Sequence, residues 1–178
     1  AGPKARAALA MDNSIKIALV GTGMFGGDVH ARAYADLQRA GLSPQLGRVG
    51  LDGWARDLAP IRFELAAVAA RTETSARRAR RNFQRWTGHA PRAFAGPKPW
   101  REILRAFPRL DVMAVATPDP LHVEVILAAL QAGVHVITEK PMCLDIAEAD
   151  QIIALARRKN RIVAVDEVQH RAGDLLRR

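Results

Sequence analysis

Apolar residues in this chain are concentrated in short runs that are separated by longer amphipathic segments. The first run, IKIALV at residues 15–20, ends at a glycine, as expected of a strand buried on both faces. Further strands are predicted at 63–70, near 93–94, and at 111–117, 134–138 and 161–165. The segments between these runs predict helices at 26–40, 73–86, 99–107, 119–131 and 145–159.

Strands that alternate with helices of this length are typical of βαβ units, in which the strands are parallel and the crossovers right-handed. The pattern therefore predicts an α/β fold with a doubly wound, mostly parallel sheet over residues 14–166. Residues 1–13 are interpreted as an N-terminal extension or tag remnant, and residues 167–178 as a junction or truncated tail.

Residues 42–61 interrupt the alternation, because they predict a long and weakly structured connection between a helix and a strand. Leu51, Trp54 and Leu58 are expected to form a small apolar patch that folds back on the domain. A contact with another subunit is the alternative interpretation.

Composition is that of one globular domain. The 178 residues are 49% hydrophobic and 25% charged, which excludes a largely disordered chain. No apolar stretch is long enough for a transmembrane helix. The single cysteine, Cys143, excludes an intramolecular disulfide and fits a reducing compartment, so a cytoplasmic location is expected.

The charge is unusual, since 27 Lys and Arg against 18 Asp and Glu give a net charge of +9. Such a balance raises the expectation of a phosphate-bearing partner, either a nucleic acid or a phosphorylated small ligand. Solvated helix faces explain scattered arginines equally well. Five arginines lie at 77–85, but Phe83 and Trp86 beside them fit core positions, so nucleic-acid binding is not favoured.

Residues 21–26 read GTGMFG, a G-x-G-x-x-G motif placed directly after a strand and at the start of a helix. In this context Gly21 permits a tight turn, Gly23 allows a pyrophosphate to approach the backbone, and Gly26 allows close packing of helix and strand. The N-terminus of the helix would then face the phosphates with its free N–H groups. A tight turn with no ligand is the alternative.

The end of the second strand bears on the choice of cofactor. An NAD enzyme commonly places Asp or Glu there, to bind the 2′-hydroxyl of the ribose. This chain has Ala70 followed by Arg71 and Thr72, and the Arg71 guanidinium can bind a 2′-phosphate. The sequence therefore favours NADP over NAD, unless Arg71 only stacks on adenine or faces solvent.

Two further turns are expected at the same edge of the sheet. Residues 117–122 read TPDPLH, in which His122 is either a structural histidine or one that faces a ligand. Glu139, Lys140 and Pro141 follow the next strand; they form either a surface ion pair on a turn or a lysine tuned for proton transfer. Because carboxyl ends of parallel strands share one edge, the three turns are expected to converge there.

Taken together, these motifs resemble the N-terminal half of the Gfo/Idh/MocA oxidoreductases, the glucose-fructose oxidoreductase and inositol dehydrogenase family. The resemblance covers nearly all of residues 14–166 and rests on the segments IALVGTGMFG at 17–26, VAART at 68–72 and AVATPDPLHVEVILAALQAGVHVITEKPM at 114–142. It implies a Rossmann domain that binds NAD or NADP and exchanges hydride with a sugar, a cyclitol or a related hydroxy compound. It points to no metal site.

The resemblance also implies roles for individual residues. Lys140 would be the catalytic lysine, hydrogen-bonded to the reacting oxygen near the nicotinamide. The cofactor would be bound by Gly21, Thr22, Gly23, Met24, Phe25, Arg71, Thr72, Thr117, Pro118, His122, Glu139 and Lys140 itself.

The chain departs from the family in two respects. Family members are about twice as long, and their second domain supplies the substrate wall and an Asp-x-x-x-His pair that nothing here matches. Residues 169–171 resemble a family step at the domain junction, but residues 172–174 lack the expected aromatic residue and proline. We therefore expect the cofactor half of an oxidoreductase, with a homo-oligomer or partner chain supplying the rest. The alternative is a non-catalytic nucleotide-binding or interaction subunit.

Overall fold

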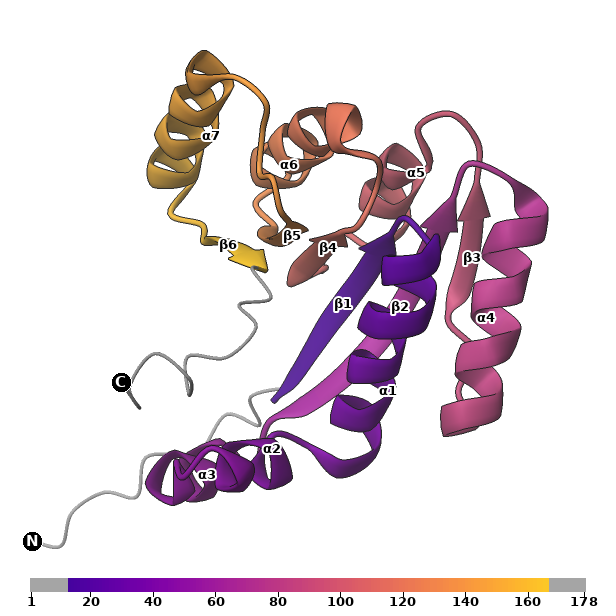
Figure 1. Cartoon of the computed structure of the whole chain (residues 1–178), viewed down its shortest axis with the longest axis vertical. Helices are drawn as coiled ribbons and strands as arrows, with labels where there is room; N and C mark the ends of the chain where they lie inside the picture. The colour runs from indigo at the N-terminus through magenta and orange to yellow at the C-terminus, as the bar shows by residue number, and fades with distance from the viewer. Residues whose placement is uncertain (1–12, 167–178) are drawn as a thin grey trace, which may run out of the picture.

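The computed structural model describes residues 13–166, which form one six-stranded parallel sheet covered by helices on both faces (Figure 1). The strands lie in the order β3-β2-β1-β4-β5-β6. This is the order of a doubly wound Rossmann fold, and it confirms the predicted fold class. The sequence interpretations of residues 1–12 and 167–178 lie outside the described residues.

The strands are β1 (Ser14–Val20), β2 (Arg62–Ala70), β3 (Arg92–Ala95), β4 (Val112–Val115), β5 (His135–Glu139) and β6 (Val163–Asp166). The helices of the first half are η1 (Phe25–His30), α1 (Ala31–Ala40), α2 (Ser43–Arg48), α3 (Asp52–Leu58) and α4 (Glu73–Thr87). Those of the second half are α5 (Pro99–Ala106), η2 (Asp119–Leu121), α6 (His122–Gln131) and α7 (Ile146–Lys159).

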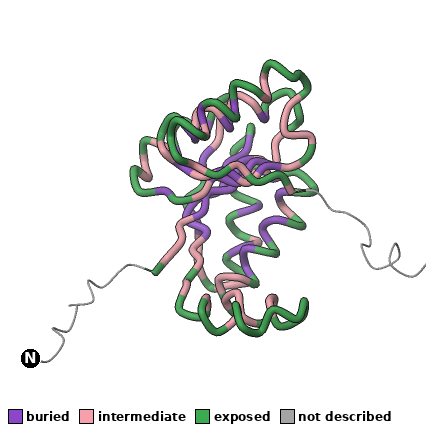
Figure 2. The backbone as a smooth tube through the Cα atoms, turned by 90° about the vertical axis from the view of Figure 1, so that its left-hand side faces the viewer, coloured by how far each residue is buried: buried purple, intermediate pink, exposed green. Residues whose placement is uncertain are grey.

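Two apolar cores lie on the two faces of the sheet. On one face α1 and α4 pack with Tyr34 and Phe83 against β1 and β2. On the other face α5, α6 and α7 pack with Trp100, Ile126 and Ile152 against the remaining side of the sheet. The central strands contribute to both cores, which is why they read as continuous apolar runs rather than as alternating ones. Figure 2 shows the buried backbone concentrated in this central sheet.

Each predicted strand and helix is present, with ends that shift by a few residues. The segment predicted as one helix over 26–40 is divided: η1 is a π-helical turn, and the regular α-helix begins at Ala31. π-Helical turns often accompany functional sites. This one follows the glycine motif directly and ends at His30.

The prediction for residues 42–61 is wrong in two respects. The segment forms two short helices, α2 and α3, joined by a hydrogen bond from the Ser43 hydroxyl to the Ala55 carbonyl at 2.7 Å. The expected patch does not fold back, since the Trp54 side chain is 64% exposed and Leu51 is also exposed. The two helices lie where β1 begins, far from the carboxyl ends of the strands (Figure 1).

No helix in the part of the chain that the structure describes has both the length and the apolar character needed to cross a membrane.

Candidate functional site

A cavity of about 570 Å³ opens at the carboxyl edge of the sheet. Its lining comes from the ends of β1, β2, β4 and β5, from the turns that follow them, and from the segment that joins β3 to α5. It lies where the strand order reverses between β1 and β4, the usual ligand position in doubly wound folds. The three predicted turns therefore converge, as the sequence suggested: the glycine motif, the turn after β4 at Thr117 and the Glu139–Lys140 turn all line this cavity.

The glycine turn is constrained by close packing on both sides. Gly21 has a φ of +98°, and a Cβ there would lie 2.2 Å from the Ala116 carbonyl oxygen. A Cβ on Gly26 would lie 1.9 Å from the Gly21 carbonyl oxygen, so the start of η1 sits directly against the turn. Gly23 differs, because a Cβ there meets no atom within 4 Å. Its backbone therefore faces open space in the cavity, where a phosphate can approach.

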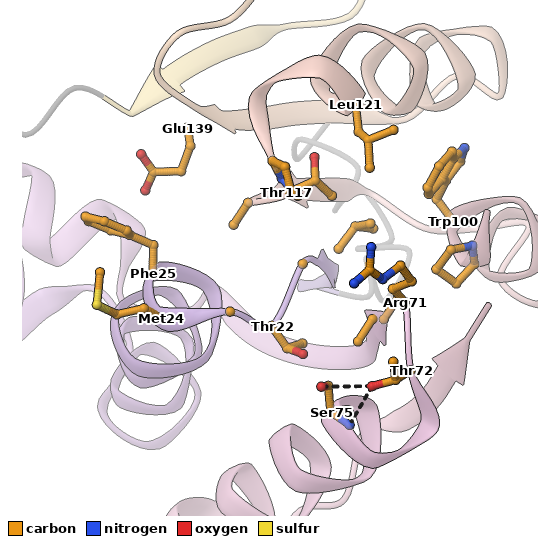
Figure 3. Close-up of a pocket in the computed structure, with 18 of the residues that line it drawn as sticks. Thr22, Met24, Phe25, Arg71, Thr72, Ser75, Trp100, Thr117, Leu121 and Glu139 are labelled. Atoms are coloured by element: carbon orange, nitrogen blue, oxygen red, sulfur yellow. Dashed lines mark hydrogen bonds between the residues drawn. The ribbon is translucent and has the colours of Figure 1, made fainter. Parts of the chain in front are cut away.

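The cavity holds buried polar atoms that match a polar ligand. Among the described residues, the hydroxyls of Thr22 and Thr117 and the indole N–H of Trp100 are buried without a hydrogen-bond partner. All three residues line the cavity. An unpaired buried polar group costs about 1–3 kcal/mol, so a ligand that pairs these atoms would recover that cost. The two threonine hydroxyls are suited to the hydroxyl and phosphate groups of a dinucleotide, whereas the Trp100 nitrogen points away from the middle of the site in Figure 3.

One end of the cavity is basic and lies beside the start of α4; we call it the Arg71 end (Arg71, Thr72, Ser75 and Arg78; Figure 3). The Thr72 hydroxyl caps α4, accepting from the Ser75 N–H at 3.3 Å and donating to the Ser75 hydroxyl at 3.0 Å. Arg71 and Arg78 are both exposed. Sequence reasoning found Arg71 and Thr72 but missed Ser75 and Arg78, which lie three and six residues beyond Thr72 on the helix.

The acidic residue next to the Arg71 end, Glu73, forms an ion pair outside the cavity. Glu73 follows Thr72, and its carboxylate pairs with Arg77 one turn along α4, with 2.5 Å between Oε2 and Nη2. Glu73 and Arg77 are not among the residues that line the cavity. The Arg71 end therefore keeps two guanidinium groups beside the N-terminus of a fifteen-residue helix, a combination that favours an anion.

The opposite end carries a carboxylate; we call it the Glu139 end (Met24, Phe25, Glu139 and Lys140; Figure 3). The Lys140 side chain is exposed at the rim, and the peptide bond from Lys140 to Pro141 is cis. Of the two alternatives for this turn, the surface ion pair of Glu139 with Lys140 is not present within residues 13–166, because Glu139 pairs with His30 instead, at 2.7 Å.

Of the two alternatives for His122, the structure fits the structural histidine, and the cofactor contact that the resemblance implies is not seen in the lining of the cavity. His122 is completely buried and is not part of the cavity lining. Its Nδ1 lies 2.7 Å from the Pro141 carbonyl oxygen and its Nε2 lies 2.8 Å from the Thr117 carbonyl oxygen. Because these carbonyls belong to two different turns, His122 joins the turn after β4 to the turn after β5. It supports the cavity rather than lining it.

Sequence reasoning missed His30 and Tyr34, which lie under the Glu139 end. Both are buried, on the face of η1 and α1 that packs against the sheet. Burial, followed by the negative charges of Asp166 and Glu139, raises the pKa of the Tyr34 hydroxyl, which therefore stays protonated. A signal was present: His30 is four residues before Tyr34 and one before Ala31, so it belongs to the buried stripe of this helix.

The comparisons with known proteins agree with this geometry. Residues 15–167 match the model of an oxidoreductase family described as having an NAD-binding Rossmann fold, Gfo/Idh/MocA. The levoglucosan dehydrogenase of Pseudarthrobacter phenanthrenivorans is 30% identical over 148 residues, which are 83% of this chain and 31% of that protein. The UDP-N-acetylglucosamine 3-dehydrogenase of Acidithiobacillus ferrooxidans is 36% identical over 72 residues, 36% of this chain and 23% of that protein.

Solved structures show the same likeness. Levoglucosan dehydrogenase in complex with NADH and levoglucosan aligns with a TM-score of 0.62 and 25% identity, over 85% of this chain and 34% of that one. This chain thus spans about a third or less of the length of the relatives it matches.

Proposed function

The chain belongs to the Gfo/Idh/MocA family of oxidoreductases with an NAD-binding Rossmann fold, and from this premise we propose that it binds NADP(H) in the cavity and forms the cofactor-binding part of a sugar or polyol dehydrogenase. The observation that carries the proposal is the convergence of the glycine turn, the Arg71 end and the Glu139 end on one cavity. A dinucleotide is long enough to contact all three.

We assign the pyrophosphate to the glycine turn, where the backbone at Gly23 faces open space and the Thr22 hydroxyl awaits a partner. The adenosine ribose belongs at the end of β2, which is the Arg71 end. The nicotinamide then falls to the Glu139 end, next to Lys140. When bound, the cofactor supplies the hydride acceptor or donor, which this polypeptide cannot supply itself.

The preference for NADP rests on charge at the Arg71 end. Arg71 and Arg78 offer two guanidinium groups, and the start of α4 adds N–H groups and a positive helix end. Ala70 stands where a carboxylate would repel a 2′-phosphate, and Glu73 is directed to Arg77. The charged side chains that line the Arg71 end are therefore both positive, and they attract a ribose 2′-phosphate.

Calorimetry with NADPH and NADH tests this preference. We expect NADPH to bind more tightly, and Arg71→Ala to weaken NADPH by about 10–100-fold, the value of one or two charge-assisted hydrogen bonds. NADH affinity should change far less in the same variant. Equal affinity of the wild-type protein for the two cofactors would contradict the NADP preference, and no binding of either would contradict the cofactor site.

Lys140 is the residue to which we assign catalysis. Its exposed ammonium group at the rim of the Glu139 end can donate a hydrogen bond to the oxygen of a bound substrate and hold or release a proton there. The sugar substrates in the names of the two relatives support a hydroxylated, sugar-like substrate class. Because the chain spans about a third or less of their length, we expect the substrate wall to come from a further domain or a partner chain.

A turnover assay distinguishes the proposed dehydrogenase from a non-catalytic nucleotide-binding subunit. NADP+ reduction measured with a panel of sugars and polyols, on the full-length protein with any partner chain, should be detectable in the wild type. Lys140→Ala should abolish it while keeping NADPH affinity within about twofold. If the wild type binds NADP+ but reduces it with none of the substrates, the non-catalytic nucleotide-binding subunit becomes the better description.

A further inference from the structure

His30 contacts the cofactor site from behind without lining it. The side chain is buried beneath the Glu139 end, and its Nε2 lies 2.7 Å from Oε1 of Glu139. Glu139 itself does line the cavity, with 12% of its side chain exposed. The two residues are 109 positions apart in the sequence, so this hydrogen bond ties the end of η1 to the end of β5.

The contact is a hydrogen bond rather than half of a metal centre. Asp166 adds a carboxylate oxygen 3.9 Å from the same His30 nitrogen, and the three residues together could be taken for a ligand set. Two ligands of one tetrahedral ion with bonds of about 2.0–2.1 Å lie about 3.3 Å apart. The 2.7 Å between His30 and Glu139 is too short for that and is typical of a charge-assisted hydrogen bond.

This hydrogen bond restricts the direction of the Glu139 carboxylate. A glutamate side chain at the end of a strand has several rotamers, and holding one of them costs entropy unless a partner fixes it. His30 is itself fixed, because it is packed in the core with Tyr34, whose ring centre lies 6.1 Å from the imidazole. In Figure 3 the Glu139 carboxylate lies at the outer side of the site above Phe25, pointing away from Thr117 and Arg71.

We propose that His30 is a positioning residue: it holds the Glu139 carboxylate where that group accepts hydrogen bonds from the nicotinamide riboside part of the cofactor. This inference rests on the proposed function, which assigns that part to the Glu139 end. Ribose hydroxyls and a carboxamide N–H are donors, and an ionised carboxylate is an acceptor with two oxygens. Since His30 occupies Oε1, Oε2 is the oxygen that the cofactor would use.

The experiment compares two ligands on the full chain by calorimetry: NADP+, and adenosine 2′,5′-bisphosphate, which lacks the nicotinamide riboside. We expect His30→Leu to weaken NADP+ by about tenfold, the worth of one hydrogen bond to a charged group. Adenosine 2′,5′-bisphosphate should bind within about twofold of the wild type. Glu139→Gln should weaken NADP+ similarly, and adding His30→Leu to it should cause little further loss.

His30→Gln is the matched control, since its amide N–H can replace the imidazole donor. It should recover most of the NADP+ affinity that His30→Leu loses. If His30→Leu does not fold, His30→Gln and Glu139→Gln still decide: near-normal NADP+ affinity in the first and a selective loss in the second support the proposal.

Two results would overturn it. Equal weakening of both ligands in a folded His30→Leu or Glu139→Gln variant would mean a general structural role. Unchanged NADP+ affinity in Glu139→Gln would mean that the carboxylate does not contact the cofactor. Failure of the wild-type protein to bind either ligand is a different outcome, because it contradicts the cofactor site itself.

Discussion

The two ends of the cavity are built in different ways. The Arg71 end is assembled from residues 71–78, which are neighbours in the sequence at the end of one strand and the start of the next helix. The Glu139 end brings together residues 24–25 and 139–140, and it is supported from behind by His30. The first end is exposed and basic, whereas the second combines exposed side chains with a half-buried carboxylate that a buried histidine contacts from behind.

The two ends therefore contribute differently to cofactor binding. The Arg71 end contributes mainly affinity, and the Glu139 end mainly the orientation of the bound groups. An exposed, charged end can attract a phosphate with side chains that remain mobile, and its contribution to affinity falls as salt rises. A carboxylate held by a hydrogen bond to a buried side chain keeps a fixed direction, which is what a reacting ring requires. Substitutions at the Arg71 end should therefore change cofactor choice, and substitutions at the Glu139 end should change orientation and stability.

The largest effect is expected at the turn that joins the two ends. Gly26→Ala places a methyl group 1.9 Å from a backbone oxygen, and we expect a loss of about 3 kcal/mol in unfolding free energy. Gly23→Ala is the matched control, since its methyl group meets open space. It should keep the stability and weaken both NADPH and NADH. Urea unfolding measures the first effect and calorimetry the second; equal stability of the two variants would contradict the packing argument.

His122→Leu should act mainly on the Glu139 end. It leaves the carbonyls of Thr117 and Pro141 without their partner, which should cost about 2–3 kcal/mol of unfolding free energy. NADPH binding should fall more than the binding of adenosine 2′,5′-bisphosphate, because the turn after β5 loses its anchor. His89→Leu, at the far end of α4, is the control. Similar losses in both histidine variants would show that His122 has no special role.

Arg78→Met tests the other end. It keeps the aliphatic stem and removes the charge, so NADPH affinity should fall by about tenfold while NADH affinity stays within about twofold. Arg81→Met, on the same helix but away from the cavity, removes the same charge from the protein as a whole. If both variants weaken NADPH equally, the effect comes from the general field and not from a contact at the Arg71 end.

The smallest effect concerns an ion pair between the start of α5 and α6. Lys98 hydrogen-bonds Glu124 at 2.6 Å and, with Arg101, lowers the pKa of that carboxyl. A folded-state pKa below the unfolded value adds stability at neutral pH that is lost as pH falls through the folded pKa. Both groups are partly exposed, so Lys98→Met should cost less than about 1 kcal/mol at pH 7. Urea unfolding should show this difference shrinking in acid; a constant difference would contradict the link.

The sequence predicts what depends on local pattern. The parallel α/β architecture, the glycine turn and Arg71 follow from runs and motifs whose members are close together in the chain. The sequence left the role of His122 open, because its partners, the Thr117 and Pro141 carbonyls, come from two turns whose meeting no local pattern reveals. The prediction for residues 42–61 failed for a different reason. Two short helices stabilised by contact with each other show little of the hydrophobic periodicity that identifies a helix in a sequence.

The three tryptophans of this chain occupy three separate environments. Trp100 is 2% exposed at the cavity, Trp86 lies under the Arg32 guanidinium at 4.1 Å from its ring centre, and Trp54 faces solvent on α3. Their fluorescence should therefore resolve into three components. Trp54 should be quenched by acrylamide, Trp86 should report the contact between α1 and α4, and the emission of Trp100 should shift as cofactor fills the site. A single Trp54→Phe variant would leave an optical sensor of occupancy and unfolding that needs no added dye.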